Sequence, residues 1–350
     1  MSQATVSRFF LGANSRYGFY SLYDQFACNP KDHLSIIKGG PGTGKSTFMK
    51  RIGAAAEEKG HDVEYILCSG DPDSLDGVYI PSLHKAWVDG TSPHIIEPKH
   101  YGIDSSYVNL GSFCQNENLS SKNQVIRNTS TAHRLCYQKA YLYLESVGKL
   151  TDYSQKVSEE QITAVRKRAQ SKIKRELHNC PILPSPPLKR FISAISYNGK
   201  LTLTSTLNSL CNRLCILSSS IGLEQIFFQE VLAEVNKQHL FYILCPSPLN
   251  PLQTEAILFP QLKLCFCIEL STSGFTGTIR TIHLDTSVEN IEKAEIKTNE
   301  KLYRELMDAA TLQLYRAKQY HDELESYYRP ALDINALNAY TDSVIRSLFT

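Results

Sequence analysis

Eight residues in the first part of the chain have the types and spacing that suit phosphate chemistry: Gly39-Gly40-Pro41-Gly42-Thr43-Gly44-Lys45-Ser46. They fit the pattern G-x-x-x-x-G-K-[ST], in which the backbone N–H groups of a glycine-rich loop surround a phosphate. Lys45 would bring a positive charge to the β- and γ-phosphates, and Ser46 would supply a hydroxyl ligand for Mg²⁺. Together with the adjoining Thr47, the loop predicts a binding site for a nucleoside triphosphate, with ATP and Mg²⁺ as the expected ligands.

The sequence also indicates the elements that position this loop. Residues 34–37 form a short apolar run, which is typical of a buried parallel strand. After the loop, Phe48, Ile52 and the alanines at 54–56 form an apolar helical face, and Gly60 stands where a helix C-cap belongs. The expected order is therefore strand, loop and helix, so that the positive end of the helix dipole faces the phosphate.

Acidic residues follow two other predicted strands. Asp89 closes the apolar run 86–88 and is the best candidate to hold Mg²⁺ through water. Asp71 and Asp73 follow the strand predicted over 62–68, at the sheet edge where α/β proteins bind ligands. Their carboxylates could align a water, bind metal or accept a proton from a substrate hydroxyl. Turn formation and helix capping are the commoner uses of aspartate, and both alternatives stay open for all three residues.

Other polar residues are weaker candidates. His94 and Glu97 lie just beyond the Asp89 strand, where a single histidine is more often a satisfied or surface residue than a general base. Arg16 and Tyr17 could touch the nucleotide base. An amphipathic helix over residues 17–26, packed beside the first strand, explains them better.

The composition describes an ordinary globular protein. The chain has 350 residues, 42% hydrophobic and 21% charged, which suggests about two domains. A net charge of +2 gives no general attraction to nucleic acid or membrane, and no apolar run approaches the length of a membrane span. The ten cysteines show no paired metal-ligand spacing and are expected to be reduced and mostly buried, in a cytoplasmic protein.

A proline-rich segment divides the chain into two similar halves. Four prolines occur within residues 180–187, which predicts a stiff linker over 181–188 between domains 1–180 and 189–350. Short strings recur across this linker at offsets of 182, 177 and 180, which indicates a tandem duplication. The paired strings are Arg8-Phe9 with Arg190-Phe191, Tyr65-Ile66-Leu67-Cys68 with Tyr242-Ile243-Leu244-Cys245, and Leu144-Glu145-Ser146 with Leu324-Glu325-Ser326.

The corresponding loop of the second half lacks the lysine and the serine of the motif. Aligning residues 34–37 with 214–217 places Gln225 at the Lys45 position, Ile226 at the Ser46 position and Glu224 at that of the preceding glycine. A carboxylate beside a triphosphate, without the cation and the hydroxyl, should bind ATP poorly. The second half is therefore predicted to be a degenerate copy, although Glu269 is expected at the place equivalent to the first-half acid at 89.

Several strings resemble those of a family of uncharacterised bacterial tandem P-loop proteins, usually described only as ATPases. The resemblance covers most of the chain and implies a nucleotide-binding fold in each half. In that family the second half often carries a working P-loop, so the degenerate copy here argues against two-site ATP hydrolysis. The strings that carry the resemblance are Gly12-Ala13-Asn14, residues 17–21, 38–46 and 68–77, Ile80-Pro81 and residues 88–94.

Two helical segments outside the loop are candidates for partner binding. Residues 165–177 carry six basic side chains, but acidic neighbours and the absence of interleaved aromatics favour a solvated helix face over a nucleic-acid site. The helix predicted over 291–328 has an apolar stripe that suits core packing better than a helical partner. A protein partner of the C-terminal half is the remaining expectation.

The chain is thus expected to be an α/β protein of two tandem P-loop NTPase-like domains, each a mainly parallel sheet flanked by helices, with long helical extensions. Three functions fit. The first is a Mg²⁺-dependent ATPase with one competent site and a regulatory or scaffolding C-terminal half. The second is a kinase that uses one of the carboxylates in residues 71–76. The third is a nucleotide-sensing module that binds without turnover.

Overall fold

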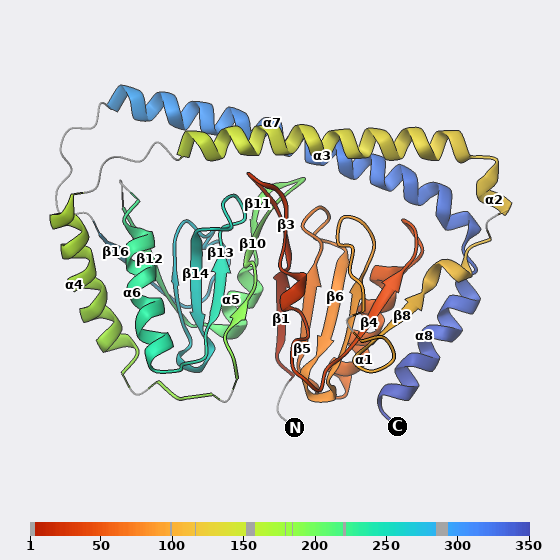
Figure 1. Cartoon of the computed structure of the whole chain (residues 1–350), viewed down its shortest axis with the longest axis horizontal. Helices are drawn as coiled ribbons and strands as arrows, with labels where there is room; N and C mark the ends of the chain where they lie inside the picture. The colour runs from red at the N-terminus through yellow and green to blue at the C-terminus, as the bar shows by residue number, and fades with distance from the viewer. Residues whose placement is uncertain are drawn as a thin grey trace.

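The computed structural model describes residues 4–98, 100–115, 117–151, 158–178, 180–183, 185–219, 222–284 and 293–350. The protein is α/β, with two mixed six-stranded sheets of mainly parallel strands, flanked by helices and set side by side beneath a pair of long helices (Figure 1). None of the helices in these ranges combines the length and the apolar character needed to span a membrane.

The first sheet holds the predicted strands and two that were not predicted, β1 and β6. Strand β6 runs antiparallel between β5 and β7, whereas β1 with β5, β7 with β4 and β4 with β8 pair in parallel. Asp76-Gly77 looks like a turn in the sequence, but both residues lie within β6, where a side chain at Gly77 would meet Ile66 at 3.2 Å. In sheet order the strands are β1 (Val6–Phe10), β5 (Val63–Leu67), β6 (Leu75–Ile80), β7 (Lys85–Asp89), β4 (His33–Lys38) and β8 (Ser105–Asn109).

The second sheet has the same order and the same strand directions. Its parallel pairs are β9 with β13, β15 with β12 and β12 with β16, and β14 again runs antiparallel between two neighbours. In the matching order its strands are β9 (Leu188–Lys189), β13 (Ile243–Pro246), β14 (Thr254–Phe259), β15 (Leu264–Cys267), β12 (Arg213–Ser218) and β16 (Thr278–His283).

Each half also contains a short hairpin at the junction between the two sheets: β2 (Gly12–Ser15) with β3 (Gly18–Ser21), and β10 (Ser193–Ser196) with β11 (Gly199–Thr202). The first hairpin shows that the helix predicted over residues 17–26 is wrong; after β3 only the 3₁₀ turn η1 (Tyr23–Gln25) follows. Phe10 and Phe191 exchange two backbone hydrogen bonds of 3.0 and 2.9 Å beside the hairpins, so the halves are joined through their backbones.

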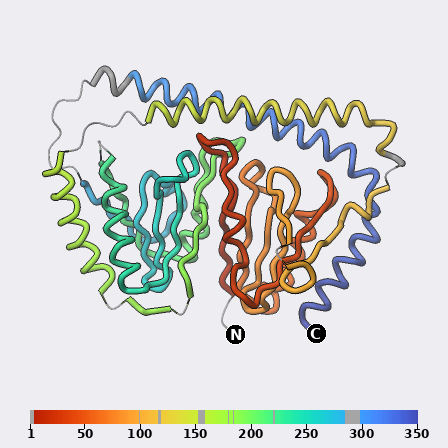
Figure 2. The backbone as a smooth tube through the Cα atoms, in the orientation of Figure 1, coloured from red at the N-terminus to blue at the C-terminus, as the bar shows by residue number. Residues whose placement is uncertain are grey.

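Two long helices, α3 (Asn123–Thr151) and α7 (Lys293–Tyr328), pack against each other across both sheets (Figure 2). Each then leads to a helix that covers the opposite half. α4 (Glu159–Glu176) packs on α6 (Glu224–Lys237) of the second half, and α8 (Ile334–Leu348) packs on α1 (Lys45–Glu58) of the first. The halves therefore exchange their last helices. The shorter elements are η2 (Pro81–Leu83), η3 (Leu110–Phe113), α2 (Glu117–Ser120), α5 (Thr204–Leu210), η4 (Pro260–Leu262) and η5 (Arg329–Ala331).

A buried ion pair also joins the halves. The Nε of Arg190 donates to Glu64 Oε1 at 2.8 Å, and its Nη1 donates to the carbonyls of Gln25 and Lys189 at 2.9 Å. The side chain of Arg190 is 2% exposed and that of Glu64 10% exposed, so both charges are removed from water and depend on each other.

The matching sheets correct the predicted alignment of the second loop. Leu75 N donates to Ser46 Oγ at 2.9 Å, and Thr254 N donates in the same way to Gln225 Oε1 at 2.9 Å. Gln225 therefore occupies the Ser46 position, and Glu224, the first residue of α6, occupies the place of the lysine that begins α1. The pairing of β4 with β7 and of β12 with β15 also places Ile268, and not Glu269, at the position equivalent to Asp89.

Candidate nucleotide site

The loop at residues 39–44 joins β4 to α1, which is the structural context that the motif requires. Gly42 and Gly44 have φ values of +70° and +83°, conformations that L side chains rarely adopt, and they let the loop curl before the helix starts at Lys45. Thr43 is buried and its hydroxyl donates to Gly40 O at 2.8 Å, which holds the curl closed. The predicted C-cap glycine is also found, with Gly60 N donating to Glu57 O at 2.9 Å.

Lys45 and Asp89 lie close together beneath this loop. Lys45 Nζ is 3.5 Å from Asp89 Oδ2 and donates to the carbonyls of Gly39 and Gly40 at 2.9 and 3.0 Å. Asp89 ends β7, the parallel neighbour of β4, and its Oδ1 accepts from the N–H and hydroxyl of Thr91 at 2.9 and 2.6 Å. Those two bonds orient the carboxylate so that its other oxygen faces the lysine.

A cavity of about 580 Å³ opens over the loop, within the range of about 300–1,000 Å³ that is typical of small-molecule sites. Asp71 lies on one side of it: its Oδ2 accepts from Ser74 Oγ at 2.9 Å, and its buried Oδ1 has no hydrogen-bond partner among the described residues. Of the residues predicted from the motif, Gly39 and Gly40 are not among those that line the cavity. The first-half lining consists of the other predicted residues, Pro41, Gly42, Thr43, Gly44, Lys45, Ser46 and Thr47, together with Lys50, Cys68, Gly70, Asp71, Ser74, Leu75, Asp76 and Asp89.

A buried polar cluster supports the floor of this cavity. Asp76 accepts from Tyr23 Oη at 2.8 Å and lies 3.1 Å from His94 Nε2. Burial alone would raise the pKa of Asp76, but the charge of His94 and the hydrogen bonds from His94 and Tyr23 hold it below its ordinary value. Burial alone would lower the pKa of His94, but Asp76 raises it. Nε2 of His94 thus has a carboxylate partner, whereas its buried Nδ1 has no hydrogen-bond partner among the described residues.

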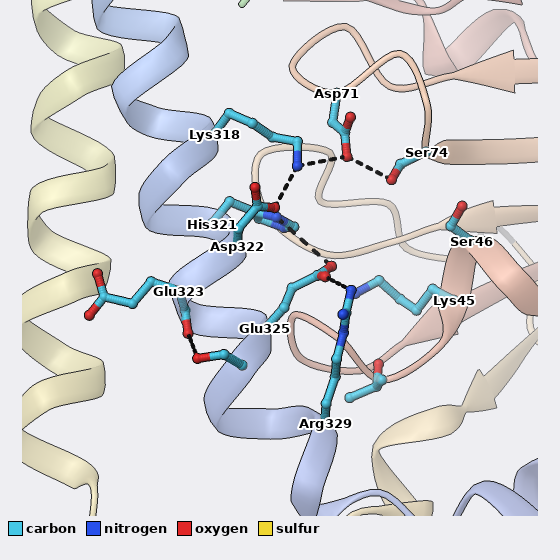
Figure 3. A network of polar contacts seen from close by, with 12 residues as sticks. Lys45, Ser46, Asp71, Ser74, Lys318, His321, Asp322, Glu323, Glu325 and Arg329 are labelled. Carbon is cyan, nitrogen blue, oxygen red and sulfur yellow. Dashed lines mark hydrogen bonds and ion pairs between the residues drawn. The ribbon is translucent and has the colours of Figure 1, made fainter.

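The opposite wall comes from the second half and from α3, and the sequence did not indicate it. α7 lies against the loop so closely that a Cβ on Gly40 would be 3.0 Å from the ring of Tyr328, and one on Gly44 would be 2.7 Å from Leu337 of α8. Burial and the charge of His321 lower the pKa of His133 to about 4. Five residues of this wall are labelled in Figure 3: Lys318, His321, Asp322, Glu325 and Arg329. The others are His133 and Tyr137 from α3, and Leu332, Ile334, Leu337 and Asn338 from the C-terminal elements.

Four other candidates are described by the structure, and none is among the residues that line the cavity. Asp73 is exposed, and its carbonyl accepts from Lys50 Nζ. Arg16 and Tyr17 lie in the turn of the first hairpin, against the second half. Glu97 is 62% exposed and pairs with Lys38.

The six basic residues at 165–177 also lie on an accessible helix, as a solvated face requires. Several of them pair with Glu176 or Glu230 of the protein itself, so these cations are partly neutralised. No disulfide joins the cysteines in the described part of the chain, and most of these cysteines are buried.

Comparisons with known proteins give no relative: no family model, no curated protein and no solved structure matches the chain.

Proposed function

We propose that the chain is a Mg²⁺-dependent ATP-binding protein of the P-loop class, and an ATPase, with one competent site at residues 39–46. The observation that carries the proposal is the 3.5 Å between Lys45 Nζ and Asp89 Oδ2. P-loop NTPases need the motif lysine at the phosphates and an acid from a neighbouring strand at the metal. Both groups lie below the glycine loop: Lys45 begins α1, which follows β4 and the loop, and Asp89 ends β7, the parallel neighbour of β4.

The oxygen groups at the site suit Mg²⁺. Ser46 would ligate the ion through its hydroxyl and Asp89 through water, while the unpartnered Oδ1 of Asp71 is a further oxygen close by. Among the described residues no three His, Cys, Asp or Glu side chains converge on a metal site of their own. That agrees with an ion held mainly by substrate phosphates, as Mg²⁺ usually is. When bound, the ion would neutralise charge on the phosphates.

The proposal includes tandem P-loop NTPase-like domains, of which the second has decayed. The equal strand order of the two sheets supports a duplication. Glu224 and Gln225 at the places of Lys45 and Ser46 remove the cation and the metal ligand from the second loop. The C-terminal half would then act as a scaffold for the first, in a protein of the cytoplasm.

A kinase is the second candidate, because Asp71 lines the same cavity and its buried Oδ1 has no hydrogen-bond partner among the described residues. Such an oxygen could accept the proton of an acceptor hydroxyl as the γ-phosphoryl is transferred. In an ATPase, the same oxygen would align a water instead.

The test is titration calorimetry of the full chain with a non-hydrolysable ATP analogue and Mg²⁺. One site per chain is expected, with loss of binding in Lys45→Ala and unchanged stoichiometry in Gln225→Ala. Release of inorganic phosphate from ATP then separates an ATPase from a kinase or from a sensor that binds without turnover. If the wild-type chain binds no analogue, the nucleotide assignment is wrong; two sites would refute the degenerate second loop.

A further inference from the structure

One face of α7 presents a line of charged side chains to the glycine loop. Lys318, Asp322, Glu325 and Arg329 follow one another at steps of three or four residues, so they share one face of α7 and of η5, which follows it directly and begins with Arg329. These four residues and His321 all line the cavity. They lie more than 270 positions after the loop and belong to the half whose own loop has lost its lysine.

This face lies against the residues that would cradle the phosphates. A Cβ on Gly42 would be 3.1 Å from the carbonyl oxygen of Glu325, so helix and loop are in van der Waals contact. Figure 3 shows the side chains of Lys318 and Glu325 from α7, and of Arg329 from the adjoining η5, extending into the space between these elements and the loop. A triphosphate held by the loop would meet this face.

The two cations on this face are paired with carboxylates of the protein, which a phosphate could replace. Arg329 donates to Glu325 at 2.6 Å, and Lys318 lies 2.5 Å from Asp322 and 3.6 Å from Asp71. The side chain of Asp322 is 53% exposed, so it can turn to solvent when a stronger anion arrives. Burial alone would lower the pKa of Lys318, but the hydrogen bond to Asp322 and the charge of Asp71 raise it, so the amine stays charged.

We propose that Lys318 and Arg329 bind the terminal phosphate of the nucleoside triphosphate, so that the C-terminal half completes the site of the N-terminal half. This inference rests on the proposed nucleotide binding and adds the residues that distinguish a triphosphate from a diphosphate. A phosphate offers three acceptor oxygens and more charge than one carboxylate, and an arginine can bind it through two parallel hydrogen bonds. A diphosphate held by the same loop would leave both cations on Asp322 and Glu325.

The experiment compares the Kd of the full chain for a non-hydrolysable ATP analogue with its Kd for ADP, both with Mg²⁺. In Lys318→Met and Arg329→Gln, which keep most of each side chain's length, the analogue should bind about tenfold to a hundredfold more weakly, whereas the Kd for ADP should stay within about twofold. Arg316→Gln is the matched control, because Arg316 is an exposed arginine of α7 that is not among the residues lining the cavity; neither Kd should change.

Three results would overturn the inference. Unchanged binding of the analogue by both variants would show that these cations do not meet the phosphate. An equal loss for the analogue and ADP would assign them to another part of the nucleotide, or to the fold. A wild-type chain that does not discriminate between the two ligands would refute it as well.

In all three cases, loss of analogue binding in Lys45→Ala would still support the proposed function. If the wild-type chain binds neither ligand, the proposed function fails first. Because the side chain of Arg329 is 70% exposed, Arg329→Gln is expected to fold, and its melting temperature checks this.

Discussion

Replacing Arg190 by methionine should destabilise the whole protein, because the change leaves the carboxylate of Glu64 buried without its charge partner. The side chains are 2% and 10% exposed and are joined at 2.8 Å, so water cannot take the place of the guanidinium. Breaking such a pair from one side costs about 3–5 kcal/mol. Two carbonyl groups, those of Gln25 and Lys189, would lose their donor as well.

The size of the effect can be expressed as a melting temperature. Unfolding entropy is about 2.1 cal/mol/K per residue, or roughly 0.7 kcal/mol/K for this chain, so 3–5 kcal/mol corresponds to a fall of about 4–7 °C. Since Arg190 and Glu64 belong to different halves, a single transition should move as a whole. Differential scanning calorimetry is the assay.

A double-mutant cycle supplies the control. Glu64→Gln alone should also destabilise, whereas Arg190→Met combined with Glu64→Gln should cost clearly less than the two single changes added together. A shift of less than about 1 °C in Arg190→Met would refute the reasoning from burial. Two separate transitions, of which only one moves, would refute the linkage between the halves.

The remaining predictions concern the site. The pKa of His94 is raised and that of Asp76 lowered, so their pair is fully charged between about pH 4 and about pH 6.5. Its stabilisation is lost as the pH rises through the raised pKa or falls through the lowered one. Urea unfolding should therefore show His94→Asn costing about 3 kcal/mol at pH 6 and clearly less at pH 9; an equal cost at both would contradict the pairing. Gly44→Ala should lower stability by more than the roughly 1–2 kcal/mol of its positive φ alone, because its Cβ meets Leu337 at 2.7 Å. Gly60→Ala, with φ +81° and nothing within 4 Å, isolates the backbone cost, and Leu337→Ala should relieve the excess; equal losses at the two glycines would show that α8 does not press on the loop.

The loop and its flanking elements were predictable because their signals are local. The glycine spacing, the apolar run before it and the helical face after it all lie within about thirty residues, and the structure places the strand at His33–Lys38 and the helix at Lys45–Glu58. The position of Asp89 beside Lys45 was also predictable, since parallel strands end at one edge of a sheet.

Other features depended on information that the sequence does not carry locally. Strand β6 was missed because the pair Asp76-Gly77 is typical of a turn. Its place in a strand could be predicted only from its pairing with β5 and β7. The matching string Tyr65-Ile66-Leu67-Cys68 aligns Ile66 with Ile243, whereas the strand pairing aligns Ile66 with Cys245, two residues further along the chain. Matching letters in apolar strands are weak evidence of register.

The far wall of the site was missed for a different reason. The line of charges from Lys318 to Arg329 has helical spacing and was detectable as a polar face, but its apposition to the loop depends on how α7 crosses the molecule. An apolar stripe on the same helix favoured core packing over a helical partner, and neither reading indicated a site. Helix α8 was not predicted as a separate helix, although Asp333 caps it by accepting from Ala336 N at 3.0 Å.

The exchange of α4 and α8 determines whether the two halves could exist apart. Apolar side chains of α1, including Phe48, are covered by α8 near the end of the chain. The rings of Phe48 and Tyr340 are stacked there, with their centroids 6.1 Å apart. The core of the second half is completed in return by Val165 and Ile173 of α4. We expect that neither half would fold alone. Cleavage in the proline-rich linker would leave the first fragment without α8, which covers α1, and the second fragment without α4, which covers α6. Each half therefore depends on the packing of the other, whatever its own loop binds.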